Sequence, residues 1–100
     1  MVFSNILSSP RGKLPLQHLL DLANIYVEGA SKAQHPDIAL VLCYDAEVAL
    51  IQARKAAMRI KDQDALYNVA TAYMGLGTEL DNRGLCSEAQ ECYKKAEKGG

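Results

Sequence analysis

The sequence contains few of the residues on which catalysis and metal binding depend. Its 100 residues include two histidines, three cysteines, one phenylalanine and no tryptophan. Zinc sites need four ligands, usually in close pairs, and neither His18 nor His35 has a cysteine or carboxylate at such a repeated spacing. A thiol nucleophile needs a neighbouring base or cation, and only Lys95 near Cys92 offers one. We therefore expect no metal, no cofactor and no enzymatic activity.

Further absences indicate the compartment. Cys43, Cys86 and Cys92 are an odd number without a CxxC pair, which favours free thiols in a reducing compartment over a disulfide framework. No apolar run approaches the roughly 18 residues that span a bilayer. The apolar stretch 1–7 is too short and too interrupted for a signal peptide. We expect a cytosolic or nuclear protein, and cytoplasmic is the default.

An excess of one charge is also lacking. The chain has 11 Lys and Arg residues against 12 Asp and Glu residues, for a net charge of −1. A chain with so small a net charge does not produce a positive electrostatic field that would attract nucleic acid or an anionic membrane. The basic cluster over residues 54–61 has carboxylates nearby, so a solvated helix end is the better interpretation. We expect neither nucleic acid nor membrane as a partner.

What the sequence does contain is helical periodicity. With 49% apolar and 23% charged residues, the chain has the composition of one soluble globular domain. Apolar residues recur at spacings of three and four in four segments, which predicts an all-α fold of two antiparallel helical hairpins. The predicted organisation is an N-terminal arm over 1–13, a helical domain over 14–97 and a flexible tail over 98–100.

Turn and capping residues separate the predicted helices. The expected breaks are a loop over 31–35, a polar break within 61–64 and a turn over 81–84. Pro36 suits the first position of the second helix because its missing N–H would be unpaired there. Asp62 or Asp64 is the candidate N-cap of the third helix. Gly84 suits a left-handed C-cap, and Ser87 is the predicted N-cap of the fourth helix.

The second predicted helix carries two apolar stripes. The first is a seam of mostly small side chains, which lets a neighbouring helix approach closely; it consists of Ala39, Leu42, Ala46, Ala49, Ala53, Ala56 and Ile60. The second lies on another face and consists of Val41, Tyr44, Val48, Ile51 and Met58. A helix that is apolar on two sides is usually the middle layer of a stack, so we expect both stripes to be covered.

Part of the sequence repeats. Four residues of the first predicted helix recur 47 positions later, Leu19, Leu22, Ala23 and Tyr26 as Leu66, Val69, Ala70 and Tyr73. Three residues of the second recur 50 positions later, Ala39, Cys43 and Ala46 as Ala89, Tyr93 and Ala96. A period in this range is typical of stacked helical repeats, in which one hairpin cannot bury its apolar face alone.

These positions resemble the tetratricopeptide repeat (TPR), whose helix A carries a large apolar residue, a small residue and a tyrosine, and whose helix B carries alanine, an aromatic residue and alanine. The stretch 65–73 matches best, and the resemblance covers residues 14–97. Three features depart from the family. The turns from helix A to helix B are four and seven residues longer, and the segment from Ala46 to Leu66 is nine residues too long. Leucine also replaces the usual tryptophan in both repeats. A generic four-helix bundle is the alternative to a TPR-like stack.

The resemblance implies a groove lined by helix A of each repeat, where family members bind peptides. The corresponding positions are Gln17, Leu20, Asn24, Val27 and Glu28 in the first repeat, and Asp64, Tyr67, Asn68, Thr71 and Met74 in the second. Asn24 and Asn68 match two positions of the clamp that some members use for a chaperone's C-terminal carboxylate. Because Leu20 replaces that clamp's lysine and a third repeat is absent, we expect a partly apolar peptide or protein ligand instead. The alternative role of these side chains is ordinary packing between helices.

Two functions are compatible with this sequence. The first is a non-catalytic protein–protein interaction module, a TPR-like adaptor or scaffold. The second is a structural bundle that forms a homodimer, paired through the alanine seam, or part of a longer repeat array. Two repeats leave both ends of a stack uncovered, whereas about three are usually needed for stability. The sequence leaves both functions open.

Overall fold

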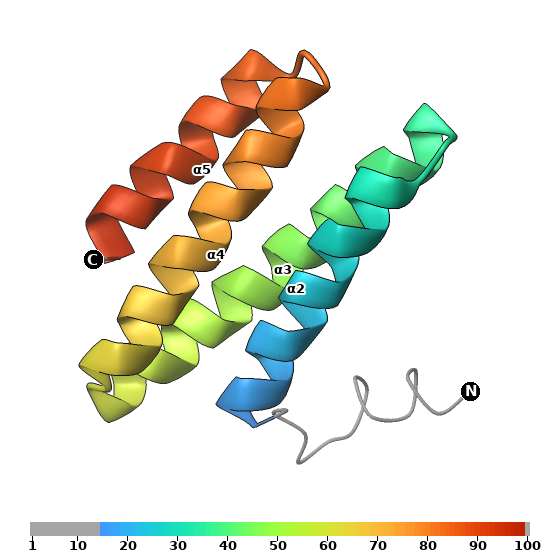
Figure 1. Ribbon diagram of the computed structural model, residues 1–100. Coiled ribbons are helices and arrows are strands. Elements are labelled where there is room, and N and C mark those ends of the chain that lie inside the picture. Colours follow the sequence, from blue (N-terminus) through green and yellow to red (C-terminus); the bar gives the residue numbers. More distant parts are fainter. Residues whose placement is uncertain (1–14, 100) are drawn as a thin grey trace.

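Four α-helices make up residues 15–99, the part of the chain that the computed structural model describes (Figure 1). They are α2 (Leu16–Lys32), α3 (Pro36–Ile60), α4 (Gln63–Asn82) and α5 (Cys86–Gly99). No strand occurs in this range, which confirms the predicted all-α fold. The predicted arm over 1–13 lies outside the described residues. None of the four helices is long and apolar enough to cross a bilayer.

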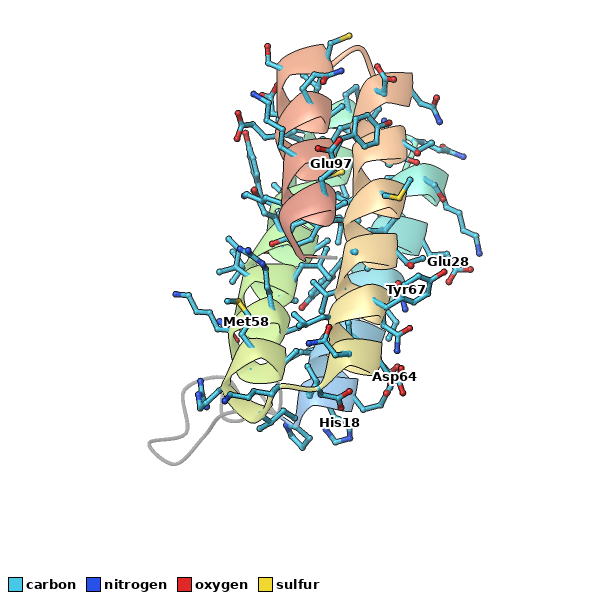
Figure 2. The ribbon with its side chains drawn as sticks, turned by 90° about the vertical axis from the view of Figure 1, so that its left-hand side faces the viewer. His18, Glu28, Met58, Asp64, Tyr67 and Glu97 are labelled. Carbon is cyan, nitrogen blue, oxygen red and sulfur yellow. The ribbon has the colours of Figure 1, made fainter. Side chains whose placement is uncertain are left out.

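The helices form two antiparallel hairpins that pack side by side. Helix α2 pairs with α3 and α4 pairs with α5, while α4 also packs against both helices of the first hairpin. The Cα positions extend over 36 × 35 × 16 Å. Since packed helix axes lie roughly 8–10 Å apart, the short dimension accommodates two layers. Helices α2 and α4 form one layer, and α3 and α5 form the other (Figures 1 and 2).

The first two helix breaks follow local signals that the sequence contains. Pro36 is the first residue of α3, and Nδ1 of His35 accepts a hydrogen bond from the N–H of Asp37 at 3.2 Å. At the next break Lys61 adopts the left-handed conformation with φ of 55°. The Asp62 carboxylate then accepts a hydrogen bond from the N–H of Ala65 at 3.0 Å. The break within 61–64 and its Asp62 N-cap are therefore confirmed.

Other boundaries differ from the predicted ones by a few residues. Helix α2 continues to Lys32, so part of the predicted loop over 31–35 is helical. Helix α4 continues to Asn82, and the turn after it contains Gly84 at φ of 82°. Helix α5 begins at Cys86, so Ser87 lies inside the helix and is not its N-cap. The helix also continues through Gly99, so the predicted tail over 98–100 is largely helical.

The alanine seam of α3 forms the centre of the core. Ala39, Ala46, Ala49 and Ala53 are buried, as predicted, together with Cys43, Leu50 and Ala57. Leu42 and Ala56 are half-buried, and Ile60, the last seam position, is 61% exposed at the end of the helix. Small side chains let α2 and α4 approach α3 closely on this one side.

The second stripe of α3 does not behave as predicted. Val41, Tyr44, Val48 and Met58 are exposed, and only Ile51 is half-buried. The expectation that α3 is a covered middle layer is therefore wrong for the described residues. The physical reason is that α2 and α4 both lie on the seam side of α3, and the short α5 packs chiefly against α4.

Two glycines of α4 have different roles. A Cβ atom at Gly77 would lie 2.7 Å from Cε1 of Tyr93, so the glycine lets the α5 ring pack against the α4 backbone. A Cβ atom at Gly75 would meet nothing within 4 Å. The close contact at Gly77 explains why a residue with poor helix propensity stands in the middle of α4.

Alanine substitutions at these glycines should therefore change stability in opposite directions. Gly77→Ala should lower the free energy of unfolding by about 1–3 kcal/mol, because the added methyl group overlaps the Tyr93 ring. Gly75→Ala should raise it by about 1 kcal/mol through helix propensity alone. Urea denaturation followed by circular dichroism measures both values. An equal gain in both variants would contradict the close approach of Tyr93.

Candidate functional site

A shallow groove lies between α2 and α4, on the layer that these two helices share. Its volume is about 250 Å³, and its lining residues are Gln17, Leu20, Asn24 and Val27 from α2 and Asn68, Thr71, Ala72 and Gly75 from α4. Residues three and four apart lie on one face of a helix, so these positions form two facing rows. The structure thus brings together six of the ten residues that the resemblance to the tetratricopeptide repeat assigned to a partner-binding groove.

The groove combines an apolar floor with polar amides at its rim. Leu20 is 5% exposed and forms part of the floor, and Val27 is half-buried beside it. Asn24 and Asn68 are exposed and come from different helices. Within the described part of the chain neither asparagine side chain makes a hydrogen bond, whereas Gln17 donates to Asp21 at 3.0 Å. The two asparagine amides are therefore free to bind a ligand.

Four predicted residues lie outside this lining. They are all exposed, with 70% of the surface of Tyr67 accessible: Glu28, Asp64, Tyr67 and Met74. Figure 2 shows Asp64 and Tyr67 on the side of the molecule that also carries Glu28 of α2. They extend the polar and apolar surface around the groove but do not line it.

Two lining residues were missed by the sequence interpretation. Ala72 lies four residues after Asn68, and Gly75 lies four residues after Thr71, so both extend the α4 row by one helical turn. Their small size gave no signal of a binding position. It is nevertheless their lack of bulk that keeps the groove open, because Gly75 has no side chain and Ala72 has a single methyl group.

Arg83 joins the two helices that border the groove. Its Nη2 donates a hydrogen bond to the carbonyl oxygen of Ala30 in the last turn of α2. Its Nε donates to Oε2 of Glu79 at 2.7 Å, and both of these side chains are largely buried. The guanidinium is thus a second donor to the carbonyl oxygen of Ala30, which also accepts a hydrogen bond from the N–H of Ala33 at 3.3 Å. This contact fixes the ends of α2 and α4 relative to each other.

A second polar contact connects α5 to α3. Nζ of Lys95 in α5 lies 2.8 Å from Oε2 of Glu47 in α3, and 5.8 Å from the centre of the Tyr73 ring. The hydrogen bond to Glu47 raises the pKa of Lys95. Glu91 stands four residues before Lys95 in α5, a spacing that favours a local ion pair, but Lys95 pairs with Glu47 instead.

The cysteines near this contact are not suited to nucleophilic chemistry. Cys43 and Cys92 are buried and free, and both line a depression of about 200 Å³ between α3, α4 and α5. Burial raises the pKa of both thiols, that of Cys92 to about 11. A thiol that is protonated at neutral pH is a poor nucleophile. Cys86 is free and exposed.

No group of three or more potential ligands gathers into a metal site within the described residues. The comparisons with known proteins add no further site. No family model, curated protein or solved structure matches the chain.

Because the pKa values of Cys92 and Lys95 are raised in the folded protein, we expect it to lose stability at alkaline pH. Above pH 9.0 the unfolded chain loses the Cys92 proton, whereas the folded chain keeps it until about pH 11. The unfolded state is therefore favoured by up to roughly 1.4 kcal/mol per pH unit in this interval. Lys95 acts in the same direction at higher pH, because its raised pKa stabilises the folded state below 10.5 and this contribution is lost above it.

Urea denaturation at a series of pH values tests this expectation. The unfolding midpoint should be level through neutral pH and fall between pH 9 and 11. Cys92→Ala should make the fall less steep, although it also lowers stability at neutral pH by leaving a small cavity. Cys86→Ala serves as the matched control at an exposed cysteine. If the unfolding midpoint of Cys92→Ala fell as steeply with pH as that of the wild type, Cys92 would not be the cause of the alkaline loss of stability.

Proposed function

We propose that the protein is a non-catalytic protein–protein interaction module, and that it binds a peptide or an extended segment of a protein in the groove between α2 and α4. One observation carries the proposal. Asn24 and Asn68 come from separate helices, line one groove and have no side-chain hydrogen bond within the described residues. The resemblance to TPR proteins, which bind peptides at the corresponding surface, supports the same conclusion.

The chemistry of the groove suits a peptide backbone. An asparagine amide has a donor and an acceptor on one planar group, so it pairs with both the C=O and the N–H of a peptide. The floor at Leu20 and Val27 accepts apolar side chains of the ligand. Tyr67 and Met74, both more than half exposed, supply the large side chains that interfaces favour.

The proposed compartment is the cytoplasm. Three free cysteines, two of them buried, suit a reducing environment. A partner there would be a cytoplasmic protein, and its segment would carry apolar side chains without needing a strong charge, because the net charge of this chain is −1.

Peptides selected from a displayed library of short random sequences, with the full chain as bait, test the proposal. Asn24→Ala and Asn68→Ala should each raise the Kd of the selected peptides by about fivefold to tenfold, as expected for the loss of one or two hydrogen bonds. Fluorescence polarisation measures this Kd. Asn82→Ala, at an exposed asparagine outside the groove, is the matched control. Failure to select any peptide, or unchanged affinities in both groove variants, would overturn the proposal.

Substitution of two tyrosines distinguishes peptide binding at the groove from binding elsewhere on the surface. Tyr67 lies near the groove, and Tyr44 lies on the exposed side of α3; both are at least half exposed. Tyr67→Ala should weaken the selected peptides severalfold because it removes apolar contact area. Tyr44→Ala should leave their affinity unchanged. The reverse pattern would place the peptide site on α3.

A further inference from the structure

The exposed stripe on α3 is an apolar surface that the groove does not use. Ile38, Val41, Tyr44, Val48 and Met58 are each more than half exposed. In Figure 2, Met58 projects from α3 on the side opposite Tyr67, and the groove lies in the layer of α2 and α4, to which α3 does not belong. Single exposed apolar residues are ordinary, but a row at helical spacings along one helix marks an interaction surface.

One pair of opposite charges on this helix, Asp37 and Arg59, is placed symmetrically about Val48. Asp37 precedes Val48 by eleven residues, and Arg59 follows it by eleven. Eleven residues make three helical turns plus about 20°, so both charges lie in line with Val48. Asp45 adds a second negative charge in the first half, and Lys55 adds a positive charge in the second half. None of these four exposed charges forms a salt bridge with any residue that the structure describes.

We infer that this face of α3 binds a second copy of the chain, with the two α3 helices antiparallel and Val48 at the two-fold axis. In this arrangement Asp37 lies opposite Arg59 of the second copy, and Arg59 lies opposite its Asp37. Tyr44 falls near Ile51 of the second copy. A parallel arrangement would instead place Asp37 beside Asp37 and Arg59 beside Arg59, which is unfavourable. The charge pattern therefore favours a second copy of the chain as the partner, and it favours the antiparallel orientation of the two α3 helices.

The surface beside the stripe can receive side chains of the second copy. A depression of about 220 Å³ lies between α2 and α3, and its lining includes Leu19, Leu22, Tyr26 and Val48. The depression between α3, α4 and α5 borders Tyr44 on the other side of the stripe. The proposed contact therefore extends beyond a single helix pair, which increases the area that the dimer would bury.

This pairing differs from the dimer that the sequence suggested. The alanine seam of α3 was the expected contact, but it is buried inside the chain against α2 and α4. Self-association through the exposed stripe leaves the α2–α4 groove uncovered. The inference is thus independent of the proposed peptide binding, and either can fail without the other.

Sedimentation velocity of the full chain over a range of concentrations tests whether the chain dimerises through the exposed stripe of α3. The wild type should show a concentration-dependent monomer–dimer equilibrium. Val48→Glu should raise the dimer Kd by at least about tenfold, because it brings two carboxylates together at the two-fold axis. Tyr67→Glu, a matched change on the opposite face, should leave the Kd unchanged. Circular dichroism verifies that both variants fold, and a wild type that remains monomeric up to its solubility limit would overturn the inference.

Charge reversal tests the direction of pairing. Asp37→Arg and Arg59→Asp should each weaken the dimer severalfold, because each places like charges opposite one another. The double variant should restore most of the affinity, even though both changes oppose the dipole of α3 and each slightly weakens the helix. A double variant that dimerises no better than the single variants would overturn the antiparallel arrangement.

Discussion

The close approach of helices to the alanine face of α3 is the constraint on which the rest of this structure depends. Ala39, Ala46, Ala49 and Ala53 have almost no surface left for solvent, because α2 and α4 both pack against them. Small side chains shorten the distance between helix axes. Two helices that pack side by side on one narrow face must also pack against each other, and the groove between α2 and α4 is the direct result.

The same constraint determines what stays exposed. Since α3 uses one face for both neighbours, its opposite face is left with apolar side chains that no described residue covers. The molecule therefore has two surfaces of different character. One is a shallow groove with free amides from two helices, and the other is a row of apolar side chains flanked by charges. The first suits a peptide backbone, and the second suits another helix.

The sequence predicted those parts of the fold that depend on local interactions. Pro36, the Asp62 cap and the left-handed Gly84 act within a few residues, so they could be recognised without knowledge of the fold. Six positions of the groove were also predicted, as positions that the resemblance to the tetratricopeptide repeat implies. The binding role of these residues stays a prediction.

What could not be predicted depends on contacts between distant residues. Periodicity showed that α3 has two apolar faces, but it does not say whether a neighbouring helix covers each of them. Lys95 pairs with Glu47, 48 residues away, whereas its spacing from Glu91 would favour a local pair within α5. Gly77 has a poor helix propensity, and only the position of the Tyr93 ring explains its place in α4.

The contact between Arg83 and Ala30 has a consequence for how the protein folds and responds to a ligand. Each hairpin is stabilised by contacts close in sequence and is expected to form quickly, whereas this contact spans 53 residues and forms only when the hairpins dock. The groove exists only in the docked arrangement, since its two walls belong to different hairpins. A ligand that bridges the walls would therefore favour docking by mass action and raise the melting temperature with its concentration.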